Sequence, residues 1–436
     1  MGLQGERNIA TGRRDPRLID RAICLCGRVD SGQASSGDEK IMHTLRALTV
    51  LLIVSGAFAC DSSTPSGTVG GASENLASAV SQTAGAPGEA AAVRGYVMAR
   101  WHDEIPAPEY AGDCPAGLNL TEEEYFPEQW KTWMTERLRL RDLGGYLPWD
   151  DDRLPPDACQ DPLVQPDPGF LTLDGPAVLH GLDLDGVDSR RADAEGGSCP
   201  HDDFPGHDGA VGIDNQFWRL MGCIRGYRPN DLMDRLHKSN VMIKEGGFAL
   251  LMEISGMDDP MNDDEIEVQI VSGNHPVTVN ALGEVMRNVS YTTHEQARFH
   301  NERAKGKIVD GILTTEPIDL RIKVKQQTMD NEFWFRDARL RAEVLPDGRI
   351  TGIVGAYWDI ENVFWTLNDQ WIGKHHQGRN AARSRGFMCA GIHHAMPRVA
   401  DGHPDPETGQ CTSISTALHF EAVPAFVIRP VLAMAD

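Results

Sequence analysis

The sequence lacks the short motifs by which several enzyme classes are recognised. Its 436 residues contain no G-x-S-x-G nucleophile motif, no supported S-x-x-K motif and no haem-binding C-x-x-C-H. They also contain no C-x-x-C pair, which argues against a thiolate metal site. No motif therefore indicates a reaction class, and function has to be argued from composition, export signals and scattered polar residues.

Positive charge is also scarce. The chain has 41 Lys and Arg against 64 Asp and Glu, a formal net charge of −23. Proteins bind the phosphates of nucleic acids through a basic stripe or patch, so this balance argues against a nucleic-acid partner. The length, with 41% hydrophobic residues, is ample for a core in one large or two medium domains.

Extended hydrophobicity is limited to a signal-like run near the N-terminus. Residues 42–59 read MHTLRALTVLLIVSGAFA, with one Arg, then an apolar stretch, then small residues. This pattern is typical of a secretory signal and is short for a membrane span. Residues 1–59 are therefore predicted to be a leader and signal peptide, with Met42 as the true start.

The residues around Cys60 suggest a lipid anchor. Ala57-Phe58-Ala59-Cys60 resembles a bacterial lipobox, although Ala57 stands where Leu is usual. By this resemblance Cys60 would be lipidated; the alternative is cleavage after Ala59 with Cys60 left free. Residues 60–91 are rich in Ser, Thr, Gly and Ala and predict a flexible tether. The predicted location is the bacterial cell envelope, with the membrane as partner.

Six further cysteines follow Cys60, and an even number in an exported chain predicts three disulfides. Pairing in sequence order is expected, because short loops close at the lowest entropic cost, with 199–223 and 389–411 the shortest. The six are Cys114, Cys159, Cys199, Cys223, Cys389 and Cys411.

Hydrophobic periodicity divides the remaining chain into two regions. Residues 92–245 are helical and loop-rich: Thr121 and Glu124 form a predicted capping box, and Pro127 opens a helix. From residue 247 several stretches alternate apolar and polar side chains with a period of two, with a hairpin predicted at Pro346-Asp347-Gly348, while residues 361–436 are less regular.

This pattern predicts a fold that is mainly β with a helical N-terminal part. We expect an antiparallel β-sandwich-like core over 246–436, which also carries a C-terminal disulfide loop. A disulfide-stapled helical and loop-rich region over 92–245 is expected to pack on or beside this core.

Two stretches place carboxylates beside glycine: LHGLDLDGVDS at 179–189 and DGAVGIDNQ at 208–216. Neither fits an EF-hand loop, which requires oxygens at positions 1, 3 and 5 and Glu at 12. A looser calcium site remains open, because Ca²⁺ accepts irregular oxygen shells. The alternative is that each Asp caps a turn or a helix start. The candidate ligands are Asp183, Asp185, Asp188, Asp208 and Asp214.

Histidines offer a further metal hypothesis. His201 and His207 flank the second acidic stretch, and histidines distant in the sequence can build a zinc site, although surface histidine is the commoner role.

Several strings are similar to those of uncharacterised bacterial exported proteins that are often predicted lipoproteins. The strings include LHGLDLDG, CPHDDF, GIDNQ and ADGHPDPETGQCTSIST, and the resemblance covers roughly residues 110–430. It implies export and family membership, and it implies nothing about chemistry.

A binding or structural accessory protein of the cell envelope, stabilised by calcium if the aspartates converge, is the favoured function. The ligand or protein partner is not indicated. The alternative is an extracytoplasmic hydrolase with its active site at the acidic loops. An enzyme would gather polar side chains from distant segments into one concave pocket, whereas a binding module would present an exposed patch.

Overall fold

The computed structural model describes most of the chain after residue 92, in one compact unit, Ala86–Asp436. The described residues are 93–104, 114–148, 151–175, 177–189, 191, 199, 201–228, 240–241, 243–325, 330–368, 371–372, 375–376 and 378–430. The leader, Cys60 and the tether lie outside these residues, so the predictions about them stay predictions. Within the described residues, no helix combines the length and hydrophobicity that a membrane crossing requires.

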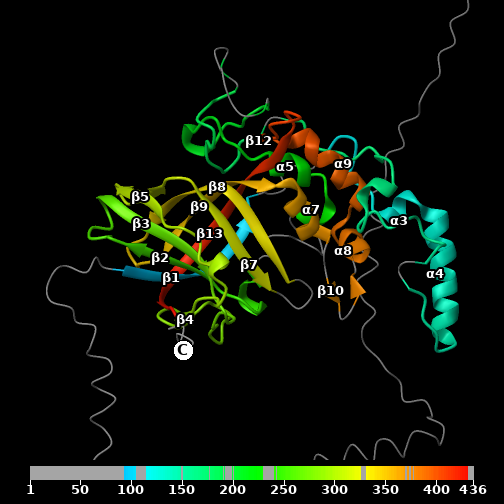
Figure 1. Cartoon of the computed structure of the whole chain (residues 1–436), viewed down its shortest axis with the longest axis horizontal. Coiled ribbons are helices and arrows are strands. Elements are labelled where there is room, and N and C mark those ends of the chain that lie inside the picture. The colour runs from blue at the N-terminus through cyan, green and yellow to red at the C-terminus, as the bar shows by residue number, and fades with distance from the viewer. Residues whose placement is uncertain are drawn as a thin grey trace, which may run out of the picture. The chain divides into compact units, whose positions relative to one another are not determined.

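A large, mostly antiparallel sheet forms the centre of this unit (Figure 1). Its main strands are β1 Val93–Asp103, β2 Leu250–Ser255, β3 Asp263–Ser272, β5 Ala304–Val309, β6 Ile312–Thr315, β8 Asp330–Val344, β9 Ile350–Asp359 and β13 Cys411–Ile428. The shorter or peripheral strands are β4 Ser290–Thr292, β7 Ile318–Lys325, β10 Trp371–Ile372, β11 His375–His376 and β12 Gly402–Pro404.

The sheet closes on itself. Its order is β1-β2-β3-β5-β6-β8-β9-β13-β12, and β1 also pairs with β13, with Gly95 opposite both Glu253 of β2 and Ala425 of β13. The inward faces therefore pack against one another, which is how the expected sandwich-like core is realised. In β7, for example, the inward residues Leu320 and Ile322 are buried. The predicted fold class, mainly β with an antiparallel core, is confirmed.

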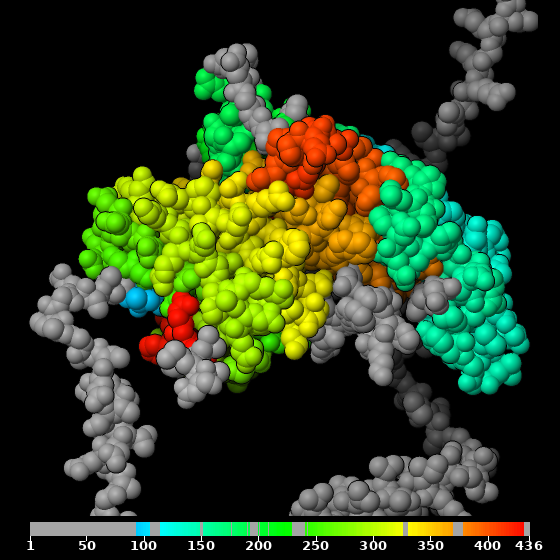
Figure 2. Space-filling model, in the orientation of Figure 1, coloured from blue at the N-terminus to red at the C-terminus, as the bar shows by residue number. Residues whose placement is uncertain are grey.

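Three of the described helices, α5, α7 and α9, pack on the sheet. They are α3 Glu122–Tyr125, α4 Pro127–Asp142, α5 Gln216–Met221, α7 Ile360–Asn368, α8 Gly378–Arg385 and α9 Cys389–Val399. Short 3-10 turns are η2 Pro162–Val164, η3 His207–Gly209, η4 Arg225–Tyr227 and η5 Ala297–Phe299. The helices α7, α8 and α9 contact one another, and α5 packs on both α9 and β13. Figure 2 shows the turquoise surface of α4 far from the yellow-green strands β3 and β5.

Local sequence signals explain how two of these helices begin. The N–H of Glu124 donates to Thr121 Oγ1 (3.2 Å) and the N–H of Thr121 donates to Glu124 Oε2 (2.9 Å), so the predicted capping box forms. Pro127 is the first residue of α4, as expected, and Trp130 and Trp133 are buried on one face of this helix.

The structure does not divide the chain between 245 and 246. The strand β1 precedes this point and belongs to the sheet, while α7, α8 and α9 follow it and pack with α5. The reason is the closure of the sheet, which requires β1 between β2 and β13.

All six cysteines after Cys60 form disulfides, but the expectation of pairing in sequence order is wrong. Neither the 199–223 pair nor the 389–411 loop forms. The entropic argument considered only the chain between two cysteines, whereas the fold brings together cysteines from distant segments. The pairs are Cys114–Cys223, Cys159–Cys389 and Cys199–Cys411, with Cα–Cα separations of 5.9, 5.0 and 6.4 Å.

Candidate cation site

Two loops, residues 177–189 and 201–215, cover the face of β9 and β13 that points away from the core. Single bridges join them, with Leu182 opposite Asp214 and Phe204 opposite Ile213. Leu182 packs directly on β9 at Gly355, where a Cβ would lie 3.0 Å from the leucine side chain. Only glycine therefore allows the first loop to approach the strand this closely.

The loops bring three of the five predicted calcium ligands together. Asp183 and Asp185 come from the first loop and Asp214 from the second, and one carboxylate oxygen of each lies within 4.8 Å of the others. Asp183 is exposed, Asp185 is half-buried and Asp214 is fully buried. The separation of these oxygens suits a shared cation, because Ca²⁺–oxygen distances are about 2.3–2.6 Å.

The other two predicted ligands have different outcomes. Asp188 does not belong to the group formed by Asp183, Asp185 and Asp214. Its carbonyl oxygen accepts a hydrogen bond from the N–H of Arg191 (3.0 Å). Asp208 lies in the turn η3, and its side chain is outside the described part of the structure.

The turn-capping alternative is also correct for Asp183 and Asp185. The N–H of Gly186 donates to Asp183 Oδ1 (2.6 Å), and the N–H of Val187 donates to Asp185 Oδ1 (2.8 Å). Each turn uses one carboxylate oxygen, so turn capping and cation binding are compatible. Asp214 is not the cap of α5, since Asn215 is the residue that precedes this helix.

Instead, Asp214 points to a histidine that two further carboxylates surround. His201 Nε2 lies 2.9 Å from Asp214 Oδ1, 2.8 Å from Asp203 Oδ1 and 3.9 Å from Asp401 Oδ2. We refer to His201 with Asp183, Asp185, Asp203, Asp214 and Asp401 as the acidic cluster.

Sequence reasoning missed Asp203 and Asp401, and it considered His201 in a zinc hypothesis rather than as a partner of Asp214. Asp401 comes from the ADGHPDPETG segment, far from the loops in the sequence, and is fully buried. Its Oδ1 accepts a hydrogen bond from the N–H of Ser415 on β13 (2.7 Å). The disulfide Cys199–Cys411 ties the two segments together close to His201. Apart from the resemblance strings, no local signal could have linked Asp401 to this place.

The charges of the cluster perturb one another strongly. Burial alone would lower the pKa of His201, but its bonds to Asp203 and Asp214, with the nearby Asp401, raise this pKa to about 11. Burial raises the pKa of Asp214 to about 6 and that of Asp401 to about 7.

Among the described residues, one imidazolium thus lies amid five carboxylates, with Arg339 donating to the carbonyl oxygen of Asp183 at the edge (3.1 Å). The cluster carries an excess of negative charge, which a bound cation would offset.

A buried hydroxyl lies beside the cluster. Tyr357 of β9 is 5% exposed, and its hydroxyl has no hydrogen-bond partner within the described structure. Burial raises the pKa of this phenol, and the negative charges of Asp214 and Asp401 raise it further, which places the hydroxyl near both carboxylates. Buried polar groups are nearly always hydrogen-bonded, to protein or to ordered water.

An open hollow of about 540 Å³ adjoins the cluster through Asp183. Its rim includes His180 and His207, whose rings stack with centroids 4.0 Å apart, and Arg341 and Ile353 lie on its sheet side. The cluster is therefore next to a space that a small molecule or a loop of a partner can enter.

No protein-family model matches the chain, no curated protein matches its sequence significantly, and no solved structure matches it. The resemblance to exported bacterial proteins stays a prediction.

Proposed function

We propose that the protein is a lipid-anchored, calcium-binding protein of the bacterial cell envelope with a binding or structural accessory role. The observation that carries this proposal is the convergence of Asp183, Asp185 and Asp214 from two separate loops. Calcium would hold the loops together on β9 and β13, and so shape the hollow beside Asp183.

The ligand chemistry favours calcium over softer ions. The three converging atoms are carboxylate oxygens, which Ca²⁺ prefers, and Ca²⁺ tolerates irregular shells. His201 is engaged with Asp203 and Asp214, so its role is to hold carboxylates rather than to bind the ion. The exposed Asp183 gives the ion a path from solvent.

The test is the thermal midpoint in Ca²⁺ and in chelator. A ligand that binds only the folded state stabilises it by mass action, by about 2.7 kcal/mol when its concentration is about 100 times Kd. Asp185→Asn should abolish the calcium-dependent rise, because asparagine keeps the turn to Val187 but loses the charge. Asp405→Asn is the matched control.

Asp405 caps an exposed turn in the same way, with its Oδ1 accepting from the N–H groups of Glu407 (3.0 Å) and Thr408 (2.8 Å). It lies outside the cluster, so Asp405→Asn should keep the response to calcium. Equal midpoints of the unaltered protein in Ca²⁺ and in chelator would contradict the proposal.

The lipid anchor is tested separately. Cys60 follows the signal-like run and precedes the predicted tether. Cys60→Ser should move the protein from the membrane fraction to the soluble fraction. If the unaltered protein is already soluble after fractionation, the anchor does not exist.

A second candidate is the extracytoplasmic hydrolase, and the hollow next to Asp183 favours it, because pockets with a few polar groups are usual sites of catalysis. A hydrolase would turn over members of a panel of chromogenic esters and glycosides, and Asp183→Asn would remove that turnover. A binding protein would show calcium-dependent stability and no turnover.

A further inference from the structure

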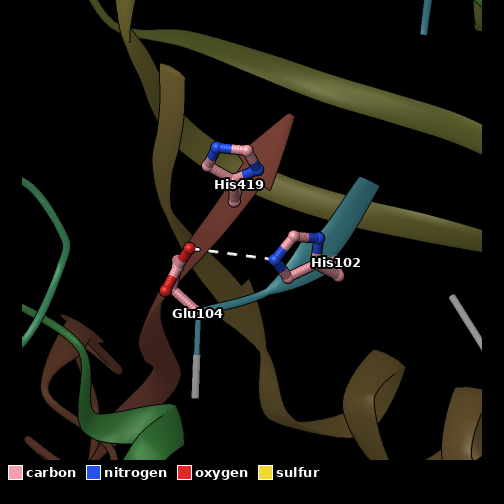
Figure 3. A group of neighbouring side chains, drawn as sticks. All are labelled: His102, Glu104 and His419. Atoms are coloured by element: carbon pink, nitrogen blue, oxygen red, sulfur yellow. Dashed lines mark ion pairs between the residues drawn. The ribbon is translucent and has the colours of Figure 1, made fainter. Parts of the chain in front are cut away.

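A second group of metal-ligating side chains lies on the same outer face of the sheet, apart from the acidic cluster. His102 lies near the end of β1 and Glu104 follows its last residue, so the two are two positions apart and their side chains lie on the same side. His419 of β13 is the register partner of His102. Figure 3 shows the side chains of His102 and Glu104 directed toward each other, with His419 beside them. We call these three residues the His–Glu cluster.

The side chains lie close together without bonding one another. His102 Nε2 is 3.8 Å from Glu104 Oε1, beyond hydrogen-bond length, and the two imidazole centroids are 5.0 Å apart. One ligand-capable atom of each residue lies within 4.8 Å of the other two. Zinc bonds to nitrogen and oxygen are about 2 Å long. The three donor atoms can therefore share one zinc ion if the side chains move closer together.

Both imidazoles have a nitrogen whose hydrogen-bonding capacity is unmet. The Nδ1 atoms of His102 and His419 are buried and have no hydrogen-bond partner within the described residues. His419 Nε2 faces the Thr351 hydroxyl (3.3 Å), a contact that orients the ring. Histidines that bind a metal through one ring nitrogen usually make a hydrogen bond of this kind through the other. Each imidazole thus keeps a nitrogen that is available to a ligand, and His102 Nε2 lies beside the Glu104 carboxylate.

The donor groups are of the types that bind a metal. Burial lowers the pKa of His102 to about 4, with His419 adding to the effect, and burial also lowers the pKa of His419. Burial raises the pKa of Glu104 only to about 6. The neighbouring Arg100 and Glu421 pair with each other (3.3 Å). Two imidazoles and one carboxylate, held within 4.8 Å of one another, are the donor types that bind transition metals.

We propose that His102, Glu104 and His419 bind one zinc-class ion and leave a fourth coordination position open. Two nitrogens and one carboxylate oxygen match the ligand preference of Zn²⁺ and argue against Ca²⁺. Three protein ligands with an open position are the arrangement of catalytic rather than structural zinc. The side chains of His102 and Glu104 are 13% and 17% exposed, so solvent can reach the fourth position.

The test is a calorimetric titration of the purified protein with Zn²⁺. Saturating Ca²⁺ is present throughout, so that the acidic cluster does not compete for zinc. We expect one Zn²⁺ per chain. The variants His102→Ala, His419→Ala and Glu104→Gln should each bind Zn²⁺ at least about 10–100-fold more weakly. That is the loss typical of substituting a residue that only hydrogen-bonds to a metal ligand. Co²⁺ in place of Zn²⁺ should give visible absorption bands in the unaltered protein that Glu104→Gln lacks.

Controls separate ligation from folding. Glu104→Gln keeps the shape of the side chain, and its thermal midpoint without zinc should match that of the unaltered protein, whereas only the latter should rise with Zn²⁺. The variant His275→Ala, at an exposed loop histidine, should bind zinc normally. Absence of one-to-one binding overturns the proposal, as does zinc binding that all three variants retain. Zinc binding that Asp185→Asn abolishes would place the ion in the acidic cluster and overturn it too. The His–Glu cluster shares no residue with the calcium site, so a negative calcium result leaves this test intact.

Discussion

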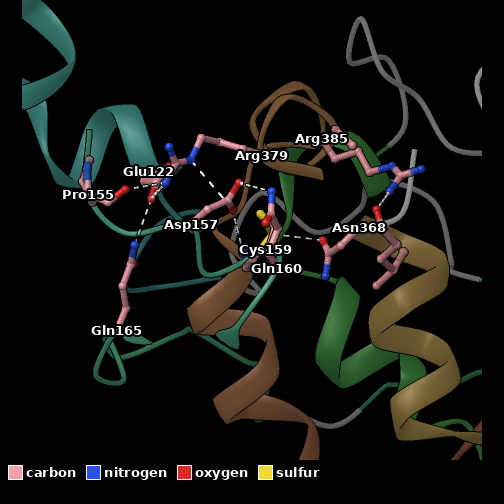
Figure 4. Close-up of a disulfide and its surroundings, with 12 residues drawn as sticks. Glu122, Pro155, Asp157, Cys159, Gln160, Gln165, Asn368, Arg379 and Arg385 are labelled. Carbon is pink, nitrogen blue, oxygen red and sulfur yellow. Dashed lines mark hydrogen bonds and ion pairs between the residues drawn. A yellow bond between two sulfur atoms is a disulfide. The ribbon is translucent and has the colours of Figure 1, made fainter. Parts of the chain in front are cut away.

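Two buried groups of charges in this protein follow opposite plans. In the helical part, Arg379 of α8 lies 2.7 Å from Glu122 of α3, and Gln165 donates to the same carboxylate (3.0 Å) (Figure 4). Arg379 also donates to the carbonyl oxygen of Pro155 (2.6 Å). The acidic cluster instead surrounds His201 with carboxylates. In the first group a guanidinium pairs directly with the buried Glu122 carboxylate, with Asp157 3.9 Å from the same guanidinium, whereas in the second, among the described residues, several carboxylates share one imidazole.

This difference separates a structural ion pair from a candidate binding site. The Glu122–Arg379 pair joins two helices beside the disulfide Cys159–Cys389. Both side chains have their partners among other groups of the chain. The acidic cluster joins two loops to the sheet and, among the described residues, gathers more carboxylates than cationic side chains. A buried carboxylate is thus no sign of function by itself; the local charge balance decides.

Breaking the balanced pair should have the largest effect on stability. Arg379→Met leaves Glu122 buried without its cation, and such losses cost about 3–5 kcal/mol in free energy of unfolding. Urea unfolding measures this. The double variant Glu122→Leu with Arg379→Met should regain much of the loss, because no charge is then left uncompensated. A single variant as stable as the unaltered protein would show that the pair contributes nothing.

Removing the disulfide at the acidic cluster should have the next largest effect. Cys199→Ser with Cys411→Ser should lower the free energy of unfolding by about 2–4 kcal/mol and also weaken calcium binding, because the bond holds the segment of His201 to β13. Cys114→Ser with Cys223→Ser is the matched control, expected to lose stability and keep its calcium affinity. Equal calcium affinity in both variants would refute the link.

The pH dependence of stability in chelator should reveal the unbalanced charge. The pKa of Asp401 is raised to about 7 in the folded protein, so its contribution is full at low pH and is lost as pH rises through that value. His201, with a pKa raised to about 11, likewise loses its contribution above its unfolded pKa of about 6.5. Urea unfolding should therefore show stability falling from roughly pH 6.5 to pH 8, above the range in which His102, with its lowered pKa, contributes with the opposite sign. Asp401→Asn should flatten this slope; a rise over the same range would contradict the account.

The smallest expected effect concerns two tyrosine hydroxyls. Tyr357→Phe should leave stability in chelator unchanged or raise it by about 1 kcal/mol, because the buried hydroxyl has no partner. Tyr291→Phe should lower stability by about 1 kcal/mol, since its hydroxyl accepts from the N–H of Thr278 (3.0 Å). Thermal unfolding of both variants compares the signs. A loss for Tyr357→Phe in chelator would mean that the hydroxyl is already satisfied.

Features that depend on a few neighbouring residues could be predicted from the sequence. The capping box of Thr121 and Glu124, the start of α4 at Pro127 and the hairpin between β8 and β9 are local, and all three form. The alternation of buried and exposed residues in β7 could also be predicted, because successive side chains on a strand point to opposite faces. The number of disulfides followed from the cysteine count.

Features that depend on which distant segments meet could not be predicted. The pairing of Cys159 with Cys389 needs the packing of helices that no local signal encodes. Asp401 enters the acidic cluster because β12 pairs with β13 and so places Asp401 next to Ser415. The His–Glu cluster depends on the register that sets His102 opposite His419, and a slip of one residue would turn one ring into the core.

The closure of the sheet also sets an order of events during biosynthesis. Gly95 of β1 finds its partner Ala425 only after β13 has been synthesised, so the sheet cannot close on the growing chain. Contacts between residues so far apart in the sequence form slowly, because the chain loses the entropy of loop closure before these contacts stabilise the fold. Until then β1 has an unpaired edge that can join another chain. An exported chain would therefore depend on protection of this edge, by chaperones or by rapid completion of translocation, until its last strand arrives.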